Sequence, residues 1–277
     1  MRVSDQFTHE EVQGFSFGYH PFARPKLIAH LYHVDGLLID TGQSTMRKAI
    51  LQTIRPLPVE QIFLTHFHED HTGNVQALQQ HFNCPVYASP KCIEQMKAPP
   101  PISLAQQMVW GKRPAFTHIT AKTDVLKTNQ YEFQLIPVPG HAPDMVVLYE
   151  PDRKWLFSAD LYVYHYISYM LPEESIWEQI HSIRRVLELD FDILLCGHNP
   201  QLQNGKALLR KKLEFLESFY HSVAKLYHLK HTAEDIFKRL NLSENRTIKW
   251  LSGGQLSKIN MVKSVVRDCI NHPPLPK

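Results

Sequence analysis

Four potential metal ligands lie close together in the segment Thr-His-Phe-His-Glu-Asp-His at residues 65–71. They are His66, His68, Asp70 and His71, and they directly follow the apolar residues 62–64. A neutral imidazole offers a lone pair and a carboxylate offers negative charge, so side chains on alternate residues of an extended segment can bind one cation. The spacing therefore predicts a metal site at the end of a strand; the competing interpretation is a polar loop of solvated histidines.

Three further candidates, His141, Asp160 and His198, each end an apolar, β-branched run that is typical of a buried strand. Gly140 and Gly197 precede the two histidines, and a glycine there would let the backbone turn so that the next side chain points across the sheet edge. Taken alone, a Gly-His pair more often marks a turn histidine than a ligand. With the first segment, however, the three complete an ordered set of seven ligand-type residues.

This ordered set, H-x-H-x-D-H followed by a distant His, an Asp and a final His, resembles the signature of the metallo-β-lactamase superfamily. The resemblance runs from about residue 27 to residue 201 and includes residues 37–42, which look like the family's early strand with its aspartate, Asp40, near the site. It implies an α/β fold, the αββα sandwich, with a C-terminal helical extension. It also implies the ligands of two metals, with His66, His68 and His141 on one, Asp70, His71 and His198 on the other, and Asp160 as the bridge.

Such a ligand set suits a two-metal hydrolytic site, and we expect two divalent metal ions. Nitrogen and oxygen ligands favour Zn²⁺, although iron or manganese fits the same positions. Two metals roughly 3.5 to 4 Å apart acidify a bridging water, so that a metal-bridging hydroxide is available at neutral pH, and they polarise the substrate oxygen. We assign a catalytic role to Asp70. No Ser-His-Asp arrangement is required, and we expect no G-x-S-x-G nucleophile motif.

Departures from the known branches of the superfamily narrow the function. The bridging Asp160 argues against antibiotic hydrolysis as the main activity, because the true β-lactamases do not use it. His68 stands where the oxygen-reducing diiron branch has a glutamate, and the dioxygenase branch lacks the complete second ligand set. Glyoxalase II shares the ligands, but its glutathione-binding segment after the bridging aspartate is missing here. These departures favour hydrolysis over redox chemistry.

In place of that segment stand tyrosines at alternate positions, Tyr162, Tyr164 and Tyr166. The alternation predicts that they share one face of a strand or extended loop. One of them could donate a hydrogen bond to a substrate oxyanion, as a tyrosine near this point does in lactonase relatives. An aromatic packing face is at least as good an explanation.

The hydrophobic pattern predicts the elements that must position the ligands. Strands are expected at residues 15–19, 27–34, 36–39, 62–64, 85–87, 115–119, 132–138, 145–149, 155–157 and 193–196. Helices are expected at residues 44–54, 72–82, 90–97, 176–188, from 205 onwards, 232–240 and 259–270. The proline-bounded apolar segment 99–110 is either a lid over the cleft or ordinary surface packing.

The 277 residues, 43% of them hydrophobic, can bury one large core, and we expect a catalytic domain at 1–204 and a basic helical region at 205–277. Residues 206–277 hold 14 Lys and Arg against 6 Asp and Glu, a balance of +8, whereas the first 205 residues hold 16 against 21, a balance of −5. The tail resembles the small winged-helix-like tail of β-lactamase-like endoribonucleases, though no wing hairpin is evident. The basic tail fits a nucleic-acid surface, a solvated helical face or a cover over the metal cleft. We expect its end, residues 272–276, to be disordered.

Three functions remain open. The first is a dinuclear metal-dependent hydrolase that cleaves a small ester, thioester or lactone, with a small acyl substrate as its partner. The second is a metal-dependent endoribonuclease or phosphodiesterase that binds nucleic acid through the basic tail, and the third is a ligand-binding regulator with little turnover. Neither a signal-type stretch nor a run of roughly 18 apolar residues is present, so we expect a cytoplasmic protein that does not enter a membrane. The sequence does not define the oligomeric state.

Overall fold

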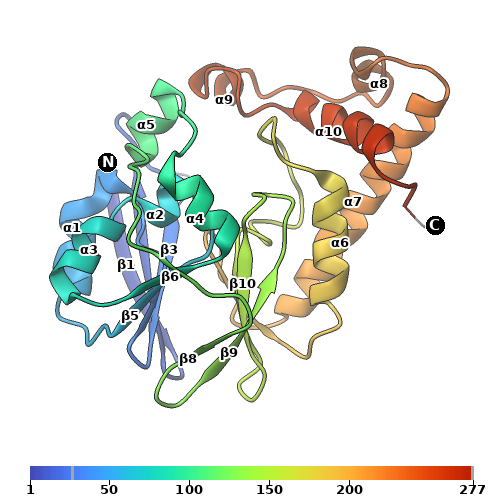
Figure 1. Ribbon diagram of the computed structural model, residues 1–277. Helices are drawn as coiled ribbons and strands as arrows, with labels where there is room; N and C mark the ends of the chain where they lie inside the picture. Colours follow the sequence, from blue (N-terminus) through green and yellow to red (C-terminus); the bar gives the residue numbers. More distant parts are fainter. Residues whose placement is uncertain (26–27, 276–277) are drawn as a thin grey trace.

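The computed structural model describes residues 1–25 and 28–275. Two β-sheets lie face to face, and helices cover the outer face of each (Figure 1). This arrangement is the αββα sandwich that the sequence predicts. Leu27, in one predicted strand, and Pro276, in the predicted disordered end, lie outside the described residues.

Each half of the chain contributes one sheet. The first sheet has seven strands in the order β1-β2-β3-β4-β5-β6-β7, namely β1 (Arg2–His9), β2 (Val12–Tyr19), β3 (Ala29–Val34), β4 (Leu37–Ile39), β5 (Gln61–Leu64), β6 (Val86–Ala88) and β7 (Thr120–Ala121). The second has five strands in the order β12-β11-β10-β9-β8, namely β8 (Val125–Lys127), β9 (Glu132–Pro137), β10 (Val146–Glu150), β11 (Trp155–Ala159) and β12 (Ile193–Cys196).

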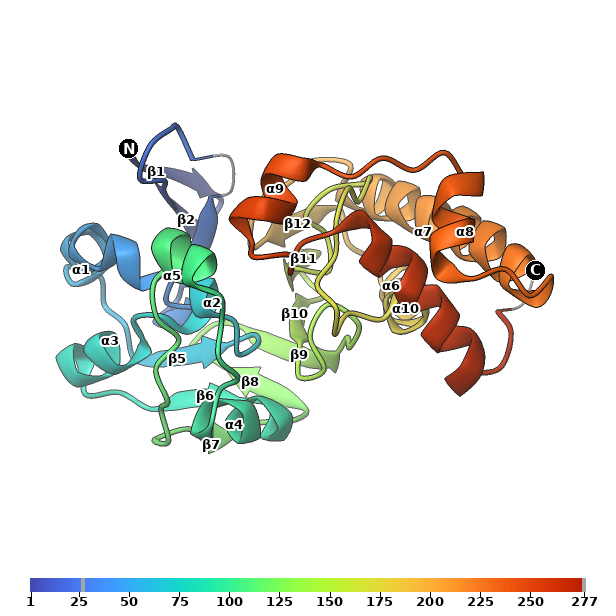
Figure 2. The same ribbon diagram turned by 90° about the horizontal axis from the view of Figure 1, so that it is seen from above.

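The helices also divide between the two halves. Those of the first half are η1 (Ser44–Met46), α1 (Arg47–Ile54), α2 (Glu69–Thr72), α3 (Val75–Phe82), α4 (Pro90–Lys97) and α5 (Leu104–Trp110). Those of the second half are α6 (Ile176–Val186), α7 (Gly205–His228), α8 (Ala233–Arg239), α9 (Arg246–Leu251) and α10 (Lys258–Asn271). Seen from above, α9 and α10 extend from α7 and α8 back towards the N-terminal half (Figure 2). None of the described helices combines the length and the hydrophobicity that crossing a lipid bilayer requires.

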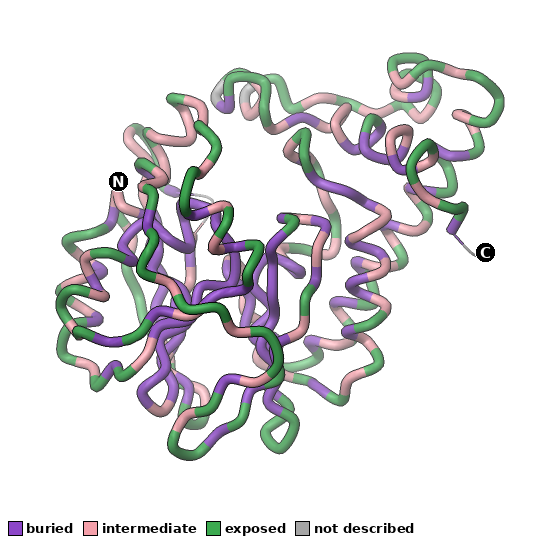
Figure 3. The backbone as a smooth tube through the Cα atoms, viewed as in Figure 1, coloured by how far each residue is buried: buried purple, intermediate pink, exposed green. Residues whose placement is uncertain are grey.

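The apolar runs of the sequence become strands that are covered on both faces. Every residue of β10 and β11 is buried, which explains why these strands show continuous rather than alternating hydrophobicity. Aromatic side chains fill the space between the sheets, where the rings of Tyr32 and Phe157 meet edge to face at 5.5 Å. The purple interior of the sandwich follows this layer (Figure 3).

Strand direction brings the ligand-type residues to one edge of each sheet. β4 and β5 run parallel, as do β11 and β12. β9 has the same direction as β11, because both are antiparallel to β10. The chain therefore leaves β9, β11 and β12 towards His141, Asp160 and His198 at one edge, and it leaves β5 towards residues 65–71.

The hairpin of β1 and β2 was only partly predicted, because β1 is mostly exposed and has no continuous apolar run. Phe7 lies opposite Gly14, where a Cβ would collide with the phenyl ring. Residues 14–18 do spell G-x-S-x-G, so the expectation that this nucleophile motif is absent is wrong. Ser16 lies within β2, however, and its hydroxyl donates to the carbonyl oxygen of Asp5 across the hairpin at 3.3 Å. It has a structural role, since a nucleophile elbow needs a turn from strand to helix.

Two local predictions are wrong. Residues 115–119 form no strand, because Phe116 alone of that segment is buried and pairing with β6 begins only at β7. The described part of the C-terminal end is also not disordered. His272 stacks on Trp177 of α6 with ring centroids 4.1 Å apart, and the indole N–H of Trp177 donates to the carbonyl oxygen of Pro273 at 3.2 Å.

The basic tail is helical throughout its described residues. Between residues 205 and 275 the structure describes four helices and no strand, so this part of the chain contains no wing hairpin. Buried Leu209, Leu216 and Tyr220 of α7 share one hydrophobic cluster with Ile180 and Ile183 of α6. The tail thus packs directly on the helix that covers the second sheet.

Candidate metal centre

The first four ligand-type side chains lie in the loop after β5 and in α2. His66 and His68 occupy the loop, whose extended backbone continues to the residue before α2, and Asp70 and His71 lie in α2 itself. All four are buried. The carboxylate of Asp144 accepts the backbone N–H of Phe67 at 2.9 Å and so fixes the loop between the two histidines.

Three imidazoles form the first cluster. His68 Nδ1 lies 3.1 Å from His66 Nε2 and 3.1 Å from His141 Nε2. Burial and neighbouring histidines lower the pKa of His66 and His68 well below the usual histidine value, so both rings are neutral at pH 7. Three imidazole nitrogens this close cannot all be satisfied by hydrogen bonds with one another, whereas one cation accepts lone pairs from all three.

The second cluster combines a carboxylate with two imidazoles. Asp70 Oδ2 lies 3.2 Å from His198 Nε2 and 3.8 Å from His71 Nε2. Burial alone would raise the pKa of Asp70, but the two imidazoles outweigh it and lower that pKa to about 2. The carboxylate is therefore an anion at any pH at which the fold is expected to work.

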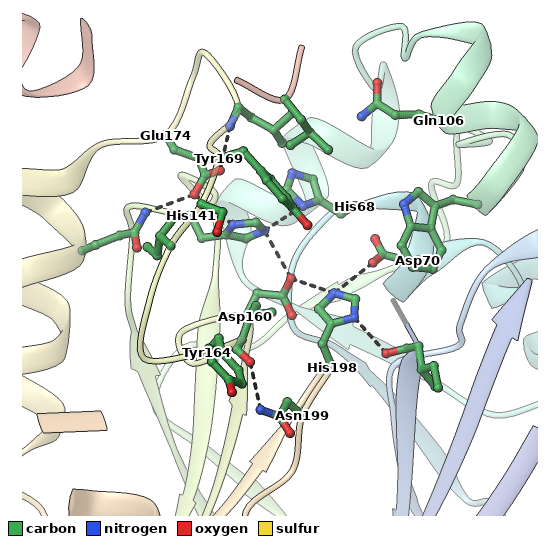
Figure 4. Close-up of a pocket in the computed structure, with 18 of the residues that line it drawn as sticks. His68, Asp70, Gln106, His141, Asp160, Tyr164, Tyr169, Glu174, His198 and Asn199 are labelled. Carbon is green, nitrogen blue, oxygen red and sulfur yellow. Dashed lines mark hydrogen bonds and ion pairs between the residues drawn. The ribbon is translucent and has the colours of Figure 1, made fainter. Parts of the chain in front are cut away.

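Asp160 lies between the clusters (Figure 4). Its Oδ2 is 3.4 Å from His141 Nε2 in the first cluster and 3.1 Å from His198 Nε2 in the second, and its Oδ1 is 3.4 Å from His71 Nε2. A carboxylate in this position can bind a cation with each oxygen. The structure thus brings all seven predicted side chains together; their role as ligands remains a prediction.

Two buried polar atoms indicate whether the clusters are suited to bind metals. His71 Nε2 and Asp160 Oδ1 have no hydrogen-bond partner among the described residues, and leaving such atoms unsatisfied inside a protein is unfavourable. Both belong to donor types that zinc prefers. Gly197 keeps the space open, because a Cβ there would lie 2.5 Å from Asp160 Oδ1 and 2.7 Å from His71 Cε1. This glycine permits a close approach, whereas Gly140, at φ +132°, makes the turn that the sequence predicts.

The outward-facing nitrogens of two histidines are held by carboxylates. Asp40 Oδ2 lies 2.7 Å from His71 Nδ1, and the same carboxylate accepts the backbone N–H of Thr65 at 2.8 Å. Glu174 Oε2 lies 3.2 Å from His141 Nδ1. Carboxylate partners of this kind fix the tautomer and the orientation of a metal-binding imidazole.

We predict that Glu174→Gln weakens metal binding about 10- to 100-fold while leaving the fold intact, because the amide no longer favours the tautomer that presents His141 Nε2. Competition with a chromophoric chelator measures the affinity. Glu173→Gln, at the exposed neighbouring position, is the matched control and should bind as the unmodified protein does. Equal affinities in the two variants would rule out the orienting role of Glu174.

A cavity of about 610 Å³ opens onto the cluster. Its walls include Trp110 of α5, Tyr169 and, from the C-terminal tail, Lys212 and Leu256. α9 of the tail lies close to α5 (Figure 1), and Leu256, which follows α9, lines the cavity. The C-terminal tail contacts the start of α5. A Cβ at Gly253 of the tail would lie 3.7 Å from the Cβ of Ser103, which is the N-cap of α5.

Arg113, just beyond α5, ties this segment to the ligand helix. Its guanidinium Nε donates to Glu69 Oε2 of α2 at 3.1 Å, and the group lies 4.6 Å from the centre of the Phe67 ring. Both charged side chains are more than nine-tenths buried. Arg113 thus holds the chain beside the cleft just beyond segment 99–110, and Gln106 and Trp110 of that segment line the cavity.

The three alternating tyrosines do not share one face. Tyr162 is fully buried in the hydrophobic core, whereas Tyr164 and Tyr166 are about half exposed and line the cavity. Of the two predicted forms, a strand and an extended loop, the strand does not form there. Tyr169, which the alternation did not single out, lies beside His68 and His141 (Figure 4).

Comparison with known proteins identifies the family. Residues 35–198 match the family model described as the metallo-beta-lactamase superfamily. The chain belongs to the metallo-β-lactamase superfamily. Among its relatives are an uncharacterized protein of Aquifex aeolicus, 28% identical over 62% of this chain and 82% of that protein, and a hydroxyacylglutathione hydrolase of Bdellovibrio bacteriovorus, 30% identical over 53% of this chain and 52% of the enzyme.

Several relatives of this superfamily member are named as hydrolases. The chain spans 52%, 61% and 58% of the first hydroxyacylglutathione hydrolases that it matches. Among solved structures, a β-lactamase domain protein of Burkholderia ambifaria superposes with a TM-score of 0.66 at 15% identity, over 95% of this chain and 87% of that one. At that identity the likeness establishes the superfamily fold.

Proposed function

We propose that this chain is a dinuclear metal hydrolase that cleaves small acyl substrates: an ester, a thioester or a lactone. The observation that carries the proposal is the Asp160 carboxylate between two clusters of ligand-type atoms. The predicted first cluster, His66, His68 and His141, would hold one ion, and Asp70, His71 and His198 would hold the other. When bound, two such ions supply a nucleophile from water at neutral pH and polarise the substrate oxygen.

Side chains of the cavity support the rest of this chemistry. Burial raises the pKa of Tyr169, so its hydroxyl stays protonated at neutral pH and can donate a hydrogen bond to an oxygen that gains negative charge. The neutral rings of His66 and His68 keep their lone pairs for a metal, and nitrogen with carboxylate ligands makes zinc the ion we expect.

The shape of the site favours a small acyl substrate over a polynucleotide. α5 and the C-terminal tail both contribute walls to the cavity, whereas a nucleic-acid strand needs an open basic groove. One tail lysine, Lys212, is buried in the cavity wall and does not add to the basic surface. Relatives named hydroxyacylglutathione hydrolases support the choice of an acyl substrate.

A substrate panel tests the proposal. Metal-free protein, reloaded with two equivalents of Zn²⁺, Fe²⁺ or Mn²⁺, is assayed on a hydroxyacyl thioester, an aryl ester, a δ-lactone and a labelled single-stranded RNA. We expect hydrolysis in at least one acyl class that disappears with a chelator and returns with metal. RNA cleavage that falls steeply with salt, without acyl turnover, would contradict the proposal in favour of a nuclease. Tight ligand binding without turnover would favour a regulator.

A further inference from the structure

Lys212 is a buried lysine in the wall of the metal cavity. Its side chain is 3% exposed, and its Nζ donates to the carbonyl oxygen of Leu161 at 2.6 Å. No carboxylate oxygen of the described residues lies within 4.0 Å of that nitrogen. An ammonium has three N–H donors, and removing its charge from water is unfavourable without a partner of opposite charge. Lys212 thus lacks the anion that a buried lysine normally has.

The carboxylates near Lys212, those of Asp160 and Glu174, are already engaged. Asp160 lies between the two clusters of ligand-type atoms. Glu174 accepts the backbone N–H of Leu171 at 2.9 Å through Oε1, and the amide of Gln179 at 3.1 Å through Oε2, which also contacts His141. The other basic residue of the cavity wall, Arg113, is paired with Glu69. The positive charge of Lys212 is therefore available to a molecule in the cavity.

Apolar side chains line the same cavity, among them Ile167, Leu171 and Leu256. We infer that the site takes an acyl substrate that carries a carboxylate, which the ammonium of Lys212 binds while the hydrocarbon part packs against these apolar residues. This inference rests on the proposed acyl hydrolase function. Lys212 is then the residue that selects charged substrates over neutral ones, since a charge-assisted hydrogen bond to a carboxylate is among the strongest polar contacts in proteins.

Matched pairs of thioesters test the inference with zinc-loaded protein. The first pair is S-glutaryl- and S-pentanoyl-N-acetylcysteamine, which differ by a carboxylate on the acyl side. The second pair is the pentanoyl thioesters of 3-mercaptopropionate and of N-acetylcysteamine, which differ on the leaving-group side. We expect the chain to prefer the anionic member of one pair, and Lys212→Met to lower kcat/KM for that member roughly 10- to 100-fold, chiefly through KM, with the neutral member unchanged.

Two further variants keep the outcome decisive. Lys211→Met, at the exposed neighbouring position of α7, should retain the preference. Lys212→Gln retains a donor for the Leu161 carbonyl and replaces Lys212→Met should that variant fail to fold. An equal loss on both members of each pair, or no preference in the unmodified chain, would overturn the inference and leave the hydrolase proposal standing.

Binding without turnover provides an independent readout. Calorimetric titration compares the affinities of glutarate and pentanoate. Each compound offers one carboxylate to the metals, and only glutarate has a second carboxylate for Lys212. The affinity ratio should fall roughly 10-fold or more in Lys212→Met. If no acyl substrate is hydrolysed but this ratio falls, the acyl hydrolase proposal fails while the carboxylate site remains; an unchanged ratio contradicts the carboxylate site.

Discussion

Asp70→Asn is expected to abolish hydrolysis while leaving the fold intact. The amide has the same shape but no charge, so the cluster of Asp70, His71 and His198 loses its own anionic ligand and would bind the second ion far more weakly. Loss of one preorganised electrostatic group of this kind costs on the order of 10²- to 10³-fold in turnover, and loss of an ion costs more. Steady-state kinetics with saturating metal, together with metal content by elemental analysis, measures both effects.

The control for this variant is Asp190→Asn, which removes an exposed carboxylate remote from the clusters. It should leave activity and metal content unchanged. Circular dichroism should give the same spectrum for both variants. Full activity in Asp70→Asn with only one ion bound would show that the second cluster is not required for the reaction.

Arg113→Met is expected to destabilise the protein by about 3 kcal/mol at pH 7. The variant leaves Glu69 buried without its guanidinium. Burial and the neighbouring Asp70 already raise the pKa of Glu69 against the opposing effect of Arg113. Without Arg113 the carboxyl group must stay protonated, at a cost of about 1.4 kcal/mol for each pH unit above its ordinary pKa. The free energy of unfolding in urea measures the loss.

The pH dependence of this loss has a definite sign. The pKa of this carboxyl group is higher in the folded state than in the unfolded state. Its contribution to stability is therefore fully present below the unfolded-state pKa, and it is lost as the pH rises through the folded-state pKa. The deficit of Arg113→Met should therefore be small near pH 4 and grow towards pH 7. The double variant Glu69→Met/Arg113→Met, which removes both charges, should recover most of the stability. A pH-independent deficit, or a double variant worse than the single one, would show that packing on Phe67 dominates.

The sequence was sufficient to predict that the seven ligand-type residues come together, because the segment 65–71 and the other three residues each follow an apolar run typical of a buried strand. β9, β11 and β12 point the same way, so strand direction brings His141, Asp160 and His198 to one edge of the second sheet. The packing of the two sheets face to face then brings residues 65–71, which follow β5 of the first sheet, near them. The partners of these residues were harder to predict. Asp40 could be placed by its family resemblance, but Glu174 reaches His141 from a loop that has no hydrophobic pattern.

Other failures arise where local pattern and three-dimensional packing disagree. Lys212 lies in the run Arg210, Lys211 and Lys212, which reads as a basic surface, yet helical geometry turns the third of these residues inwards. The alternation of Tyr162 and Tyr164 suggested a strand, but the chain there forms the irregular wall of the cavity. In both cases burial depends on residues distant in sequence, which no local window contains.

The proposed ligands follow strands of both sheets, so bound metal would hold the two sheets together. Metal supply would then affect the stability of the folded chain and its lifetime in the cell. An ion shared by His68 and His141 closes a loop between positions 73 residues apart, and it binds the folded chain alone. At a free metal concentration a hundred times the dissociation constant, such binding adds about 2.7 kcal/mol to the free energy of unfolding. In a metal-starved cell that increment disappears, the unfolded fraction rises about a hundredfold, and proteases reach the chain more often. Its abundance would then follow the metal supply of the cell.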